Sequence, residues 1–158
     1  MNKISIIEVI QLMLAPGIMI SACGLLILGI NNKYSMVVNR IRLLNEERRR
    51  ILGKLSDKAF NLEENVRIAS ISKQLQALGF RVRLVRNSVL SYTIAVALFV
   101  VTSLSIGFEY YIGAAELTFI VTILFLLGMI SVLVGVTFGA YETIKGYKIV
   151  EIEIKIDE

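Results

Sequence analysis

The sequence contains no histidine and no tryptophan, only one cysteine (Cys23) and only one proline (Pro16). A single cysteine cannot form a disulfide within the chain, and without histidine neither a zinc site nor a haem site has its usual ligands. Gly-rich phosphate loops, Gly-x-Ser-x-Gly elbows and His-Glu-x-x-His pairs are also absent. We therefore expect no cofactor, no metal and no enzymatic activity.

Charge is concentrated in one part of the chain. Residues 31–88 hold thirteen Lys or Arg and five acids, whereas the rest holds four basic residues and eight acids. Apolar residues make up 56% of the 158 residues and the mean hydropathy is +0.72, which is too high for a soluble domain of this size. The composition predicts an integral membrane protein.

Three segments without a charged residue are long enough to cross a bilayer: residues 9–30, 88–107 and 117–140. At ~1.5 Å per residue, ~20 residues cross a hydrocarbon core of ~30 Å. Pro16 is expected to bend the first helix. The run from Ile20 to Cys23 resembles a lipoprotein cleavage box, but the sequence stays apolar after Cys23, which favours a membrane span.

The distribution of Lys and Arg predicts the orientation. Basic residues favour the cytoplasmic side, so we expect residues 31–88 and the tail, residues 141–158, inside, and the N-terminus and the loop at 108–116 outside. Because membrane topology accounts for the basic residues, we expect no nucleic-acid partner. The expected location is the inner (plasma) membrane of a cell, with several passes.

The segment between the first two spans carries two heptad series, the pattern of a coiled coil. When the chain folds back near Asn61, Ile41 lies opposite Val82 and Arg48 lies opposite Leu75, so the two series are in register. We therefore predict a long antiparallel helical hairpin over residues 31–88, with its turn at about 56–63. The series are Val37, Ile41, Leu44, Arg48, Ile51 and Leu55, and Ile68, Ile71, Leu75, Leu78, Val82, Val85 and Val89.

The predicted fold is thus an all-α membrane protein of three transmembrane helices with this hairpin between the first and second. Both hairpin arms are expected to continue into their spans without a break. The tail from residue 141 to 158 fits an amphipathic helix or a strand of alternating Ile and charged residues, and its continuity with the third span favours the helix.

Basic residues near the membrane boundary are predicted to hold anionic lipid head groups. This collar consists of Lys33, Arg40, Arg42, Arg81, Arg83 and Arg86. Arg48 occupies a heptad core position, where its long side chain either reaches past Leu75 to water or specifies register and subunit number.

Small residues recur on one face of the third span, which allows close helix packing in lipid. They are Gly128, Ser131, Gly135 and Gly139, and a weaker stripe in the first span comprises Gly17, Ser21, Gly24 and Leu28. Their partner is either a helix of the same chain or a second subunit.

Polar groups along the first span, and acids at the outer mouth, are candidates for lining a pore built by several subunits, because three helices cannot enclose one. Alternatively, the acids lie in the outer interface and the hydroxyls bond to their own helix. The candidates are Gln11, Ser21 and Asn31, with Glu8, Glu109 and Glu116 at the mouth.

Three short motifs at the membrane boundaries resemble an uncharacterised bacterial family of small three-span membrane proteins, one of the families labelled as domains of unknown function. They are Asn31-Asn32-Lys33-Tyr34 with Arg40 and Leu44, Leu84-Val85-Arg86-Asn87, and Tyr141-Glu142. The resemblance implies the three-span architecture and no mechanism. The order of spans and hairpin is also similar to the core of the YidC and Oxa insertases, although no Lys or Arg lies within a span here.

From these features we expect a homo-oligomeric membrane protein that conducts cations. The alternatives are a non-conducting scaffold that docks partners through its basic hairpin, and an insertase-like role.

Overall fold

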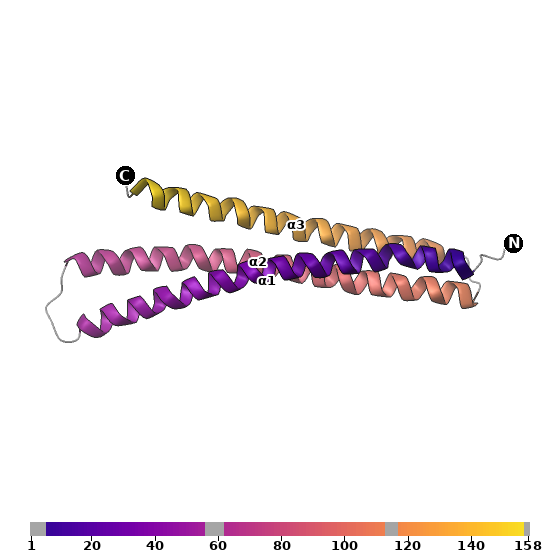
Figure 1. Ribbon diagram of the computed structural model, residues 1–158, viewed down its shortest axis with the longest axis horizontal. Helices are drawn as coiled ribbons and strands as arrows, with labels where there is room; N and C mark the ends of the chain where they lie inside the picture. The colour runs from indigo at the N-terminus through magenta and orange to yellow at the C-terminus, as the bar shows by residue number, and fades with distance from the viewer. Residues whose placement is uncertain (1–5, 56–61, 113–116, 157–158) are drawn as a thin grey trace.

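Three long helices make up the protein in a computed structural model (Figure 1). Helix α1 is Ile6–Leu55, α2 is Leu62–Ile112 and α3 is Leu117–Ile156, with 50, 51 and 40 residues. The structure describes residues 6–55, 62–112 and 117–156, and none of these residues is in a strand. The predicted all-α fold is confirmed, whereas the predicted turn near Asn61 lies outside the described residues.

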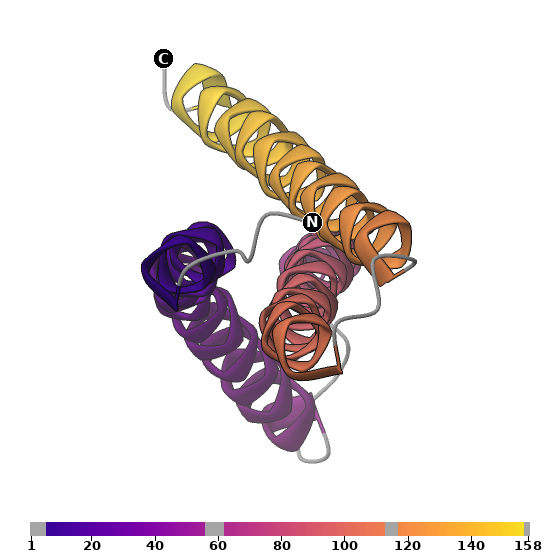
Figure 2. The same cartoon turned by 90° about the vertical axis from the view of Figure 1, so that its right-hand side faces the viewer.

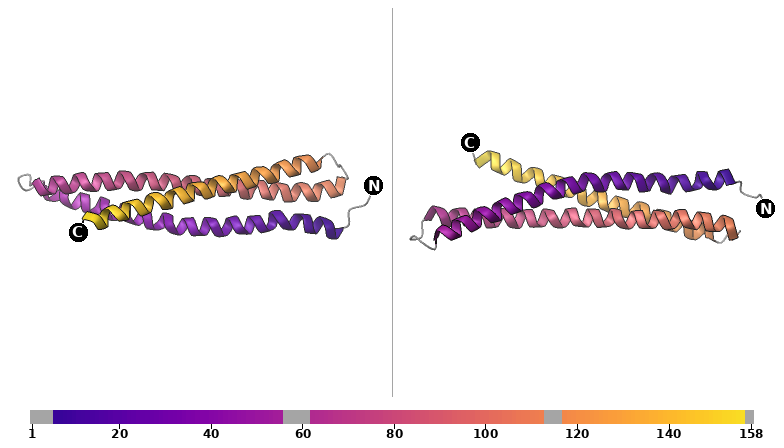
Figure 3. Two further views of the ribbon diagram at one scale, coloured as in Figure 1. Left: turned by 90° about the horizontal axis from the view of Figure 1, so that it is seen from above. Right: turned by 60° about the horizontal axis from the view of Figure 1, so that its bottom comes forward.

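Helix α2 lies between the other two helices (Figure 2). α1 and α2 run side by side in opposite directions, and α3 turns back along the other side of α2 (Figure 1). α1 and α3 meet near the middle of the molecule, where Ile30 lies against Gly139. Towards its C-terminal end α3 inclines away from the arms of the hairpin, as Figure 3 shows.

The helices run without interruption from the apolar segments into the hairpin. α1 passes through Pro16, which is fully buried, and α2 continues to Ile112, beyond the predicted end of its span at residue 107. At ~1.5 Å per residue α1 is ~75 Å long, more than twice the ~30 Å of a hydrocarbon core. More than half of its length must therefore extend beyond the membrane.

Each helix contains a stretch that is long and apolar enough to cross a membrane. Only 11%, 22% and 11% of these stretches in α1, α2 and α3 are buried within the protein. Because such an exposed apolar surface is tolerated only in lipid, the protein is an integral membrane protein.

The hairpin arms of α1 and α2 pack through the predicted series. Val37, Leu44, Ile71 and Leu78 are buried together, and Ile41, Ile51, Leu75 and Val82 pack against them. All eight residues belong to the two heptad series. Arg48 is exposed, as expected of a side chain that reaches water.

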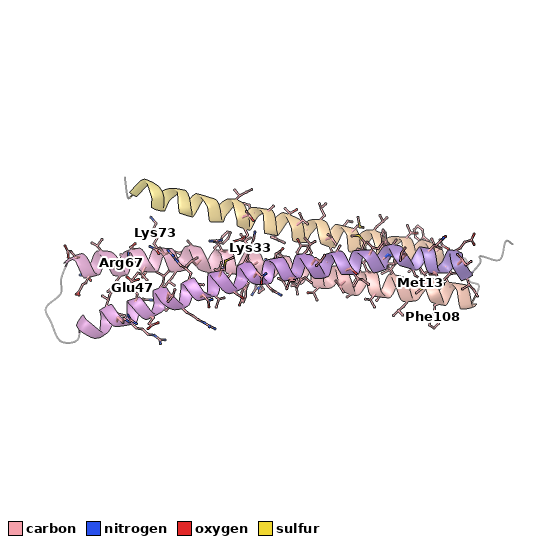
Figure 4. The ribbon with its side chains drawn as sticks, in the orientation of Figure 1. Met13, Lys33, Glu47, Arg67, Lys73 and Phe108 are labelled. Carbon is pink, nitrogen blue, oxygen red and sulfur yellow. The ribbon has the colours of Figure 1, made fainter. Side chains whose placement is uncertain are left out.

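Polar contacts add to this apolar seam at the surface of the hairpin. Arg67 of α2 donates to Glu47 of α1 at 2.8 Å, and Figure 4 shows the two side chains on facing arms. Arg50 pairs with Glu46 one turn away on α1. Such exposed pairs contribute only ~0.5 kcal/mol each, so the apolar seam dominates the packing of the arms.

Within the apolar half, Cys23, Ala95 and Phe99 form a second buried cluster, against which Met19 and Phe125 pack. The rings of Phe99 and Phe125 lie 5.5 Å apart at 55°, a tilted arrangement that aromatic pairs favour. α3 then remains helical to Ile156. The tail is therefore a helix to that residue and not a strand.

Candidate functional site

The carboxylate of Glu142 is buried where the three helices meet, with 2% of its side chain exposed. Arg81 of α2 donates to its Oε1 atom from Nε at 3.0 Å and from Nη2 at 2.7 Å. The Nζ atom of Lys33 of α1 lies 3.7 Å from Oε2. One acid of α3 thus pairs with a cation from each of the other helices.

Lys33 also connects α1 to the backbone of α3. Its Nζ donates to Thr143 Oγ1 at 2.8 Å, and Thr143 in turn donates to the Gly139 carbonyl at 3.0 Å. In Figure 4 Lys33 lies at mid-length of the molecule, where α3 passes α1. We call Lys33, Arg81, Glu142 and Thr143 the Glu142 cluster.

Gly146 makes room for the guanidinium of Arg81. A Cβ atom at position 146 would lie 2.8 Å from Nη2 and 3.1 Å from Cζ of Arg81, closer than carbon normally approaches. Glu142 and Gly146 are one turn apart on α3 and therefore face the same side. The glycine exposes the surface of α3 on which the planar guanidinium lies.

The cluster lies at the level where the predicted spans end. Lys33 follows the first span by three residues, Glu142 follows the third by two, and Arg81 precedes the second. Removing charges from water is costly unless they are paired and hydrogen-bonded, and here two cations surround one acid. The geometry can therefore hold the hairpin and the spans in a fixed relation.

Within the third predicted span, on the N-terminal side of Glu142, α3 approaches α2 closely through its small residues. A Cβ at Gly128 would lie 2.7 Å from Phe99, and one at Gly135 would lie 2.6 Å from Tyr92. Ser88 Oγ donates to the Gly135 carbonyl at 2.6 Å, and Ser131 Oγ donates to the Ser91 carbonyl at 2.7 Å. The predicted stripe on α3 therefore packs within the chain.

A family model described as "Protein of unknown function (DUF2721)" matches residues 13–152. The chain belongs to the DUF2721 family. This result confirms the resemblance to an uncharacterised family of membrane proteins. Comparison with curated proteins and with solved structures finds no match.

In this DUF2721 protein the corresponding small residues of α1 remain open. Cβ atoms added at Gly17 and Gly24 would meet nothing within 4 Å, and Leu28 is 59% exposed. At 3.6 residues per turn Asn31 and Ser35 continue this line, and both are exposed. We call these residues the α1 stripe: Gly17, Ser21, Gly24, Leu28, Asn31 and Ser35.

The pore candidates do not share one face of the DUF2721 protein. Ser21 and Asn31 belong to the α1 stripe, whereas Gln11 lies about 120° around the helix from the middle of that stripe. The hydroxyls of Ser21 and Ser35 donate to carbonyls one turn back, at 3.3 and 3.1 Å, as the alternative interpretation predicted.

Two of the three acids predicted at the outer mouth lie in described helices, at the end of the molecule where α1 begins and α2 ends (Figure 1). Glu8 is exposed in the first turn of α1, and Glu109 at the far end of α2 accepts a hydrogen bond from Thr118. Glu116 lies outside the described residues.

The predicted basic collar divides into two groups. Lys33 and Arg81 contact Glu142. Arg40, Arg42, Arg83 and Arg86 are exposed. Among the described residues, Arg42, Arg83 and Arg86 form no ion pair.

Sequence reasoning did not assign a role to Glu142, Ser88 or Tyr92. A signal for Glu142 was present: it is an acid two residues after an uncharged span, and basic residues lie outside the other two spans, Lys33 by three residues and Arg81 by seven. The described residues contain no group of three or more His, Cys, Asp or Glu residues suited to a metal ion.

Proposed function

We propose that the protein is a homo-oligomer of the plasma membrane, in which copies pack through the α1 stripe and the hairpins project into the cytoplasm as rigid stalks. The observation that carries this proposal is the contrast between the two small-residue faces. The face on α3 is filled by Tyr92 and Phe99 of the same chain, whereas an added Cβ at Gly17 or Gly24 meets nothing.

The position of the α1 stripe supports a second copy as its occupant. At 3.6 residues per turn the stripe lies roughly 120–180° around α1 from Lys33, which contacts α3. A neighbouring subunit can therefore approach α1 without displacing α3. In lipid, close packing of small residues replaces the hydrophobic drive to association, and two identical stripes are complementary to each other about a two-fold axis.

The orientation of the assembly is inferred from charge. The hairpin carries thirteen of the seventeen Lys and Arg residues, and basic loops stay on the cytoplasmic side. Three spans then place the N-terminus outside and the tail inside.

Replacing Gly17 and Gly24 with leucine is expected to weaken association at least tenfold, because two large side chains would hold the stripes apart. The measurement is oligomeric mass in nanodiscs over a range of protein-to-lipid ratios. Gly29→Leu is the matched control, because position 29 is equally open but lies about 120° from the stripe. A strictly monomeric unmodified protein would contradict the proposal.

Cation conduction is a second candidate function of this oligomer. It is favoured by the exposed amide of Asn31, which places a polar group on the face where copies would meet. We expect liposomes containing the oligomer to pass K⁺ in preference to Cl⁻, and Asn31→Leu to lower the flux. If homogeneous oligomers pass no ions at any voltage, the conduction hypothesis is excluded, whereas the proposed assembly is not contradicted.

Without flux, the oligomer would be a scaffold whose exposed Arg48, Arg49 and Arg50 dock a cytoplasmic partner. A stoichiometric partner that crosslinks to the intact hairpin and not to a variant with these arginines neutralised would support that role. An insertase-like role has no comparable support, because no basic residue lies within the three predicted spans.

A further inference from the structure

Two arginines of α2 lie at the membrane boundary without an ion pair to any residue that the structure describes. Arg86 and Arg83 precede the second predicted span by two and five residues, which places their backbone ~3 and ~8 Å outside the hydrocarbon core. The head-group layer on each side is ~5–8 Å thick. Both side chains are exposed, and neither forms an ion pair with a described residue.

A third arginine of α2, Arg81, does have an ion-pair partner. Arg81 faces α3 and pairs with the buried Glu142, whereas Arg83 and Arg86 lie on the opposite side of α2 at 3.6 residues per turn. Glu142 is already shared by Arg81 and Lys33. The positive charge of Arg83 and Arg86 is therefore not neutralised at this level by a described acid.

A row of exposed apolar side chains, called the apolar track, follows these two arginines along α2 into the second predicted span. Leu90, Ile94 and Val101 are 57%, 49% and 46% exposed, and helical spacing places all three on the same face as Arg83. Guanidinium groups bind phosphate through several donors in a fixed plane. Cationic donors at head-group depth above an apolar track match a phospholipid, with its phosphate above its acyl chains.

We propose that Arg83 and Arg86 form a binding site for the head group of an anionic phospholipid whose acyl chains lie along Leu90, Ile94 and Val101. Charge complementarity selects an anionic lipid over a zwitterionic one, because each basic residue near an anionic surface adds favourable energy. This site lies on a single chain and does not depend on the proposed oligomer.

The test uses the full-length protein in nanodiscs of phosphatidylcholine with and without phosphatidylglycerol. Phosphatidylglycerol is expected to raise the Tm of the unmodified protein, and native mass spectrometry is expected to show bound phosphatidylglycerol. Replacing both arginines (R83Q and R86Q) should lower the apparent affinity for phosphatidylglycerol about 30-fold and abolish the rise in Tm. Because both side chains are exposed, the Tm in pure phosphatidylcholine should stay unchanged.

The matched control is R48Q with R49Q, which removes the same charge from exposed positions farther along the hairpin. This control should keep the phosphatidylglycerol effect. Equal losses in both double variants, or none in R83Q with R86Q, would overturn the proposal. So would stabilisation by inorganic phosphate added to pure phosphatidylcholine nanodiscs, because the site would then recognise free phosphate and not a lipid.

Discussion

Replacing Glu142 with glutamine is expected to lower the free energy of unfolding by about 3 kcal/mol. The change leaves Arg81, which is 22% exposed, without the carboxylate that accepts both of its hydrogen bonds. Lys33 contributes less to the loss, because its side chain is 44% exposed and is solvated by water without a partner. Reversible unfolding in mixed micelles measures the difference.

Glu46→Gln is the control for this experiment. Glu46 also pairs with an arginine, Arg50, but both side chains are largely exposed, and the expected loss is below ~0.5 kcal/mol. Equal losses for the two variants would contradict the role of the Glu142 cluster. Replacing the pair together, with Glu142→Leu and Arg81→Met, should recover most of the loss, because no buried charge then lacks a partner.

Gly135→Ala is expected to destabilise the protein by about 2 kcal/mol. The new Cβ would lie 2.6 Å from Cε1 and 2.8 Å from Cδ1 of Tyr92, and Tyr92 is only 2% exposed. Because the ring has little room to move, α3 must shift away from α2, which also strains the hydrogen bond from Ser88 to the Gly135 carbonyl. The same unfolding measurement applies.

Gly139 provides the comparison, because it lies one turn after Gly135 on the same face of small residues of α3. A Cβ at this position would lie 3.5 Å from Ile30 and from Ser88, an ordinary contact distance, so Gly139→Ala should be neutral or stabilise by up to ~1 kcal/mol. Adding Tyr92→Leu to Gly135→Ala should recover part of the loss. Equal effects of alanine at the two glycines would contradict the close contact of α3 with α2 at Gly135.

The hairpin could be predicted from the sequence because its arms contact each other through a strict repeat. Residues such as Leu44 and Leu78 recur at heptad spacing, and the register that pairs them follows from folding the segment on itself. Lipid-facing helices carry no such signal, because apolar residues occur on all their sides. This difference explains why the spans could be located but not oriented about their axes.

Because the rotation of each span about its axis could not be predicted, the contact partners of the small residues and of the charged residues could not be predicted either. Gly135 indicates a close approach of some helix, but only the rotation of α2 shows that Tyr92 fills the space. Likewise, Arg81 and Arg83 look equivalent in the sequence. One faces Glu142 and the other faces outward because they lie about 200° apart on α2.

The Glu142 cluster also has a consequence for the order in which the protein is made. Synthesis proceeds from the N-terminus, so Lys33 and Arg81 are both translated before Glu142, which follows Arg81 by 61 residues. Until α3 has been made, the two cations have no buried acid to share, and the hairpin and the first two spans are held together only by the apolar contacts between α1 and α2. The last helix to emerge is the one that completes the structure.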